Sequence, residues 1–215
     1  MQQRKFLSLA AAAVLVLVAL VGAGTASADR LCSTNVSPCP AGNIYASGTS
    51  ISASLKAGAT AKVTTSGGLI NPTITCTASS VGLKTSSAGG GSGVAISGSL
   101  TSLSMSSCTS TNPSGCSSSG TVSGLPTSGS ISHSSSFNGS LTAGAPAVKF
   151  TCSGLACTFG GSGNVTGSVS GGNPAGVTFS NQTLASAGGF GCPTKAVWSA
   201  AYSAKSPSAI WVTGS

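Results

Sequence analysis

Apolar and polar residues alternate with a period of two along most of this chain. In residues 49–56, apolar side chains occupy every second position from Ile51 to Leu55, and serines fill most of the positions between them. This alternation predicts a β-strand with one buried and one solvated face. Similar short segments predict further strands at residues 61–65, 73–77 (TITCT), 147–152 (AVKFTC), 156–159 and 164–170 (NVTGSVS).

Glycine, asparagine and proline separate these segments, and such residues mark turns. No long segment has the 3.6-residue apolar period of an amphipathic helix. The pattern therefore predicts an all-β chain of about ten short strands. We expect a disulfide-linked β-sandwich or jelly-roll-like domain, with a barrel as the remaining all-β architecture.

Large side chains gather at the C-terminal end, in residues 188–212. This segment contains both tryptophans, Trp198 and Trp211, together with Tyr202 and Cys192. Trp198 and Tyr202 are four residues apart, so they lie on the same face of a strand. Because the rest of the chain has few large side chains to fill a core, we expect this face to point inward.

The N-terminus has the features of an export signal. Arg4 and Lys5 precede an apolar run at residues 6–21, and an Ala-Ser-Ala sequence ends at Ala28. This predicts a signal peptide at residues 1–28 and a single all-β domain at residues 29–215, secreted or associated with the cell envelope. The apolar run is shorter than the roughly 20 residues of a transmembrane helix, so no membrane span is expected after cleavage.

Charged residues are unusually rare, at 5% of the chain against about 25% in typical domains. Without residues 1–28, seven of the nine Lys and Arg residues remain, and Asp29 is the single acid, which gives a net charge of +6. The cations are scattered along the sequence, so specific nucleic-acid binding is not expected. Cell-envelope polymers or glycans are the partners considered, and simple solubility is the alternative role of the charge.

The sequence contains few residues that could act as catalytic acids or bases. Paired carboxylates need two acids, and a serine–histidine–acid triad needs a histidine held by an acid. His133 is the single histidine, it has no acid near it in sequence, and no serine lies in a G-x-S-x-G motif. We therefore predict no enzyme activity, no catalytic residue, no metal site and no cofactor.

The eight cysteines all follow residue 28, and an even number in an exported chain indicates up to four disulfides. Two intervals of similar composition, which begin at Cys76 and Cys157, suggest one pairing among the 105 possible. In that pairing, Cys76 bonds Cys108, Cys157 bonds Cys192, Cys32 bonds Cys39, and Cys116 bonds Cys152.

Two functional hypotheses follow. The first is a non-enzymatic extracellular or envelope protein with a structural or adhesive role. The second is a binding module for a glycan or a small apolar ligand, in which Trp198, Tyr202 and Trp211 contact the ligand.

Three sequences support a resemblance: TITCTASS around Cys76, FGGSG after Cys157, and GGFGCPTKAVWSAAYS around Cys192. They resemble exported, cysteine-containing β-proteins of actinobacteria. The resemblance implies secretion and an all-β, disulfide-linked domain, and it carries over no active site.

Overall fold

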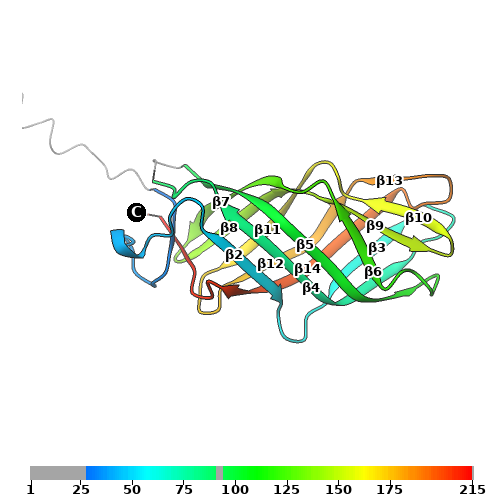
Figure 1. Cartoon of the computed structure of the whole chain (residues 1–215), viewed down its shortest axis with the longest axis horizontal. Coiled ribbons are helices and arrows are strands. Elements are labelled where there is room, and N and C mark those ends of the chain that lie inside the picture. The colour runs from blue at the N-terminus through cyan, green and yellow to red at the C-terminus, as the bar shows by residue number, and fades with distance from the viewer. Residues whose placement is uncertain (1–27, 91–93, 215) are drawn as a thin grey trace, which may run out of the picture.

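The computed structural model describes residues 28–90 and 94–214, and these residues form an elongated β-barrel (Figure 1). Eight strands close into a ring through antiparallel hydrogen bonds, and the ring is completed where β4 pairs with β5. In ring order they are β5 (Ile96–Thr111), β7 (Thr127–Ser135), β8 (Asn138–Gly144), β11 (Asn164–Ser170), β12 (Gly176–Leu184), β14 (Lys195–Ser206), β2 (Ser50–Leu55) and β4 (Thr73–Thr85).

Shorter strands continue the same barrel wall toward its other end. β6 (Ser119–Ser123), β9 (Ala147–Cys152) and β10 (Leu155–Phe159) follow one another beside β5, and β13 (Ser186–Gly188) pairs with β10. β3 (Ala61–Ser66) fills the place between β14 and β4. In most places around the ring, two consecutive short strands lie end to end and act as one long strand with a single interruption. Each of these long strands pairs with the ones before and after it in the sequence, as in an up-and-down barrel.

Proline and glycine explain several of these interruptions. Pro126 lies between β6 and β7, Pro146 between β8 and β9, and a glycine-rich segment between β10 and β11. Proline has no N–H to donate to a ladder, so pairing stops there although the chain continues along the wall.

The interior of the barrel is apolar, and β14 shows how it is filled. Its inward positions alternate small and large side chains, and all five are buried: Ala196, Trp198, Ala200, Tyr202 and Ala204. Such alternation lets bulky side chains from opposite walls share a narrow lumen.

A two-stranded sheet covers one end of the barrel. It is formed by β1 (Arg30–Cys32) and β15 (Trp211–Thr213), and the backbone N–H of Val212 donates to the Phe137 carbonyl after β7. Leu31 and Val212, which pair with each other in this cap, are both buried. A single 3₁₀ turn, η1 (Ala41–Asn43), follows β1.

The four disulfides have the same pairs that we derived from the sequence. Cys76–Cys108 joins two barrel strands at directly paired positions. Cys116–Cys152 and Cys157–Cys192 tie loops to β9 and β10, and Cys32–Cys39 closes a small loop near the cap.

The all-β class and the disulfide links agree with the sequence prediction, whereas the architecture differs from it. We expected a sandwich or jelly roll of about ten short strands, but the described residues form fifteen strands, and their main sheet closes on itself. Closure follows from β4 and β5, whose long ladder runs from Thr73↔Thr111 to Thr85↔Gly98.

Two other predictions concern the signal peptide and the absence of a membrane span. The predicted signal peptide, apart from Ala28, lies outside the described residues. Within the described part of the chain, no helix has the length and apolarity required to cross a bilayer.

Candidate functional site

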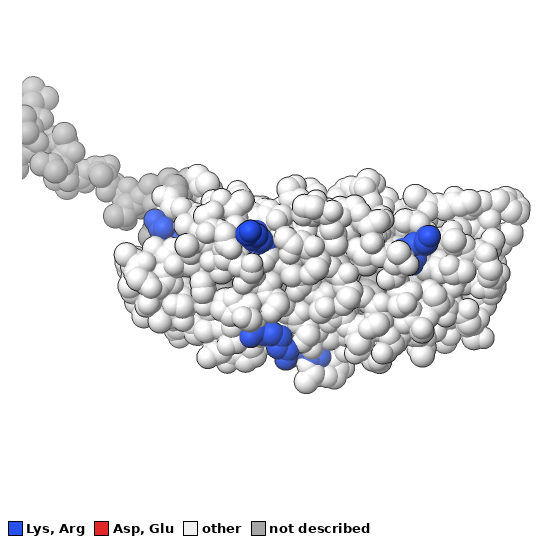
Figure 2. All heavy atoms as spheres, in the orientation of Figure 1, with Lys and Arg blue, Asp and Glu red and all other residues white. Residues whose placement is uncertain are grey.

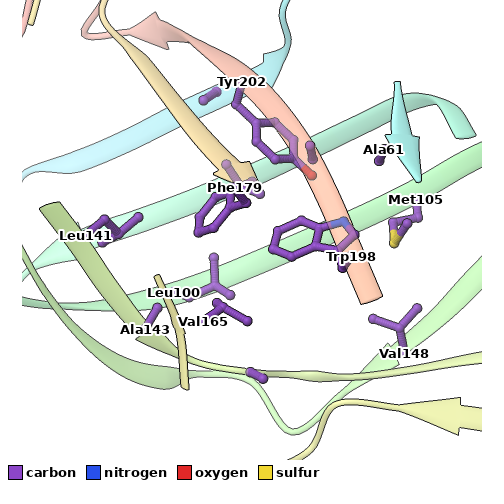
Figure 3. Close-up of a cluster of buried hydrophobic side chains, with 14 of the residues drawn as sticks. Ala61, Leu100, Met105, Leu141, Ala143, Val148, Val165, Phe179, Trp198 and Tyr202 are labelled. Atoms are coloured by element: carbon purple, nitrogen blue, oxygen red, sulfur yellow. The ribbon is translucent and has the colours of Figure 1, made fainter. Parts of the chain in front are cut away.

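The candidate site is the group of aromatic side chains inside the barrel, carried by β14 and β12. Trp198 and Tyr202 point from β14 into the interior, where both meet Phe179 of β12 (Figure 3). The Trp198 and Phe179 ring centroids are 4.7 Å apart at 30°, and those of Phe179 and Tyr202 are 6.3 Å apart at 80°. Both geometries fall in the favourable range for aromatic pairs.

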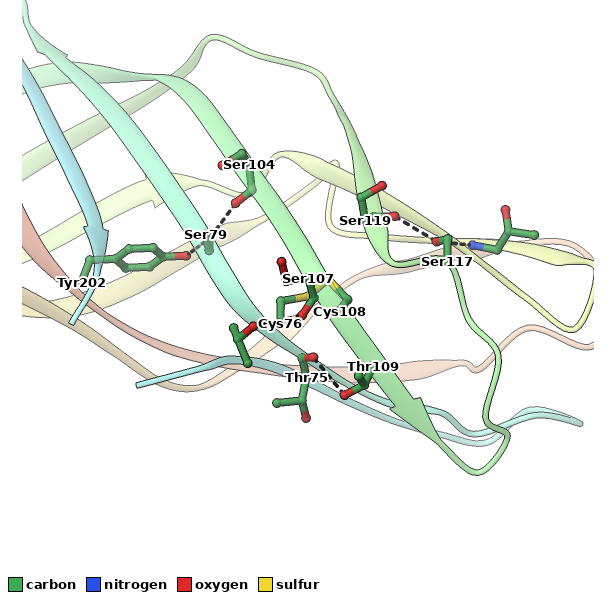
Figure 4. Close-up of a disulfide and its surroundings, with 12 residues drawn as sticks. Thr75, Cys76, Ser79, Ser104, Ser107, Cys108, Thr109, Ser117, Ser119 and Tyr202 are labelled. Carbon is green, nitrogen blue, oxygen red and sulfur yellow. Dashed lines mark hydrogen bonds between the residues drawn. A yellow bond between two sulfur atoms is a disulfide. The ribbon is translucent and has the colours of Figure 1, made fainter. Parts of the chain in front are cut away.

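Tyr202 ends in a buried chain of hydrogen bonds (Figure 4). Its hydroxyl lies 2.9 Å from the Ser79 hydroxyl, which donates to the Ser104 carbonyl at 2.6 Å. Since Ser79 has a single proton and uses it for Ser104, the Tyr202 hydroxyl donates to Ser79. Burial raises the pKa of Tyr202 above the ordinary tyrosine value.

Trp198 has no such partner among the described residues. Its side chain is 8% exposed, and its Nε1 atom is the only buried side-chain polar atom without a hydrogen bond among the residues that the structure describes. A buried donor without an acceptor is unfavourable, because it has lost its bonds to water and gained none.

The indole of Trp198 lines an interior cavity of about 50 Å³, which we call the central cavity. Every residue around it is apolar, including Leu100, Leu141, Val148 and Val165 (Figure 3). The barrel is therefore largely filled by its own side chains, and the remaining cavity is small and apolar.

Trp211 lies apart from this group. It belongs to β15 in the cap, where it pairs with Cys32 and is partly exposed. The sequence predicts Trp198, Tyr202 and Trp211 as ligand contacts. The structure brings the first two together inside the barrel and leaves the third at its end.

Asp29 and His133 come close in space although they are distant in sequence. Asp29 is buried, and its Oδ2 accepts a hydrogen bond from the His133 backbone N–H at 3.0 Å. The His133 ring points elsewhere, with Nε2 3.0 Å from the Ser136 carbonyl. The carboxylate therefore holds the backbone of β7, and the pair differs from a catalytic dyad, in which the acid bonds the imidazole.

The loops that follow β3 and β13 lie at the barrel end opposite the cap (Figure 1), and together they form an open hollow of about 690 Å³. It is formed by residues 67–69 and the loop at 186–194, and Leu69 and Phe190 are exposed there. The hollow contains no acid, histidine or lysine among its lining residues, so its polar groups are limited to backbone groups and hydroxyls.

The outer surface carries rows of hydroxyl groups that run around the barrel, each with one serine or threonine on each of four adjacent strands. Row 1 is Ser97, Ser130, Thr142 and Thr166. Row 2 is Ser132, Ser140, Ser168 and Thr178. Row 3 is Ser203, Ser54, Ser80 and Ser104.

Few charges interrupt these hydroxyls. Figure 2 shows separate lysine and arginine side chains on the visible face, with wide uncharged areas between them. Neighbouring strands are about 4.8 Å apart, so each row presents closely and regularly spaced donors and acceptors. The serines are evident in the sequence but the rows are not, because the alignment of residues on adjacent strands depends on register.

The described residues contain no cluster of His, Cys, Asp or Glu side chains that could hold a metal ion. Comparison with known proteins identifies no relative: no family model, curated protein or solved structure matches the chain.

Proposed function

We propose that this chain is an exported, non-enzymatic protein of the cell surface or envelope, with a structural or adhesive role. The observation that carries the proposal is the sparsely charged outer wall with its three hydroxyl rows. Rows of serine and threonine offer many weak hydrogen bonds at regular spacing, which suits a neutral polymer with repeating hydroxyls, such as a glycan.

The rest of the molecule supports such a role. Four disulfides and a closed barrel restrict the chain, so the rows are held rigidly in place. A rigid surface loses little conformational entropy on binding, and this favours many weak contacts acting together. Disulfides also suit an oxidising compartment outside the cytoplasm.

Co-sedimentation with insoluble cellulose, chitin and peptidoglycan tests this proposal. We expect the unmodified protein to sediment with at least one of these polymers. A double variant in row 2, Ser168→Ala with Thr178→Val, removes two outward hydroxyls with little change in shape and is expected to bind several-fold more weakly.

A matched control is available on β12. Ser180→Ala with Thr183→Val makes the same two chemical changes at exposed positions outside the rows, and it should bind like the unmodified protein. Absence of binding to all three polymers, or equal loss in both double variants, would contradict an adhesive role for the rows.

A further inference from the structure

We propose that the barrel interior is a binding site for a slender, mostly apolar molecule that carries one hydrogen-bond acceptor, which the Trp198 Nε1–H contacts. This inference goes beyond the adhesive role, because it concerns the inner face of the barrel and a small ligand.

The unpaired indole N–H is the first support. Buried polar groups in folded proteins nearly always have a partner, and within the described part of the chain this one has none, although Trp198 is only 8% exposed. Its neighbour Tyr202 shows the usual arrangement, since its hydroxyl meets Ser79. A ligand with an oxygen or nitrogen acceptor would give Trp198 the bond that the protein does not supply.

The lining of the central cavity argues against water as that acceptor. A buried water is normally held by two to four polar partners. Here the surrounding residues are all apolar apart from the indole N–H itself. A water molecule would therefore keep about one hydrogen bond, whereas a molecule with a single acceptor and an apolar body would match the site.

The form of the interior indicates the shape of the ligand. A second cavity of about 20 Å³ and a third of about 50 Å³ adjoin the central one and share Leu83 and Leu141 with it. The third reaches the cap, where Leu31 and Ile210 line it. Three small cavities separated only by shared side chains suit an aliphatic chain, with its acceptor at Trp198 and its tail toward the cap.

Ligand class follows from these two features together. An aliphatic ketone, aldehyde or alcohol has one polar group and a narrow body. A sugar has too many hydroxyls for a site with one donor, and a charged head group would be buried without a counter-charge.

Nuclear magnetic resonance of the indole N–H tests the proposal directly on the unmodified protein. Two indole signals are expected, and a Trp211→Phe variant assigns them. Titration with 2-hexanone should move the Trp198 signal downfield in a saturable way, while n-hexane should perturb neighbouring methyl groups without the same downfield shift. A Trp198 signal unaffected by 2-hexanone overturns the proposal.

Two variants locate the site. Trp198→Phe keeps an aromatic ring and removes the donor, so the affinity for 2-hexanone should fall about tenfold, toward that of n-hexane, which corresponds to one ordinary hydrogen bond. Ala143→Leu fills the junction of the central and second cavities and should abolish binding of both probes. The nuclear magnetic resonance spectrum of the Ala143→Leu variant shows whether it is folded. Unchanged binding in the folded variant would place the ligand elsewhere and refute the proposal.

Discussion

The indole ring of Trp198 lies against the phenyl ring of Phe179, with the ring centroids 4.7 Å apart. The two residues come from neighbouring strands, and Trp198 pairs with Gln182, three residues beyond Phe179. A bulge between Phe179 and Gln182 shifts the register at this point. Both rings belong to the buried apolar core of the barrel, so the contact contributes to core packing.

Replacing Trp198 with alanine should therefore destabilise the fold strongly. We expect a loss of about 3–5 kcal/mol in unfolding free energy, as for other buried aromatic truncations. Urea denaturation followed by circular dichroism measures it, and Trp211→Ala in the partly exposed cap is the comparison, with a smaller loss. A loss below about 1 kcal/mol at Trp198, the range of surface substitutions, would be inconsistent with its buried role.

Alkaline pH should weaken the fold through Tyr202. Burial holds the pKa of this tyrosine above its ordinary value, so the folded protein binds the phenolic proton more tightly than the unfolded chain. The resulting stabilisation is complete below about pH 10, the ordinary tyrosine pKa, and is lost as the pH rises through the folded-state value.

Denaturation of the Tyr202→Phe variant isolates this effect. It should lose about 1 kcal/mol at neutral pH with the hydrogen bond to Ser79, and its stability should fall less steeply above about pH 10 than that of the unmodified protein. Part of the alkaline fall should remain, because burial also raises the pKa of Tyr45. Identical pH profiles for the two proteins would argue against the role of Tyr202.

The disulfides should differ in how much they contribute to the free energy of unfolding, according to the length of the loop that each closes. Cys76–Cys108 closes a separation of 32 residues, and Cys32–Cys39 one of 7. The chain-entropy model gives about 4 kcal/mol for the longer loop and about 2 kcal/mol for the shorter. Thermal and urea unfolding of the two double cysteine-to-alanine variants compares the two losses of stability. A larger loss for the variant without Cys32–Cys39 would contradict the prediction.

Gly167 should not tolerate a side chain. A Cβ atom at this position would lie 2.9 Å from Cε1 of Phe179 and 3.0 Å from Cγ2 of Val177. Overpacking of this kind costs about 1–3 kcal/mol, so Gly167→Ala should lower the unfolding midpoint in urea. Gly189→Ala is the control, since nothing lies within 4 Å of its Cβ position, and equal stability of the two variants would contradict the prediction.

Much of the local structure could be predicted from the sequence. Alternation with a period of two identifies the strands and their buried faces, and the inward face of β14 follows from it, because Trp198 and Tyr202 fall on the same side. The hydrogen-bonded position of Ser79 could not be predicted, since a serine on a buried face has the same local pattern as one that faces solvent.

The order of strands around the barrel was harder to predict. Gly124 and Pro126, or Ala145 and Pro146, produce the same local signal as a turn. In the barrel the chain continues in the same direction past both breaks, so β6 and β7, and likewise β8 and β9, belong to single barrel positions. Counting each break as a turn produces many short strands, and many short strands favour a sandwich.

The sequence by itself determined the all-β class and the apolar face that Trp198 and Tyr202 share, because both depend on local alternation, and it suggested the cysteine pairs that the structure contains. Only the tertiary structure decided that the sheet closes, that hydroxyls align into rows, and that the Trp198 N–H finds no partner in residues 28–90 and 94–214. These properties depend on register and on contacts between strands distant in sequence. The alternation of apolar and polar residues cannot reveal them, because it has the same period of two in an open and in a closed sheet.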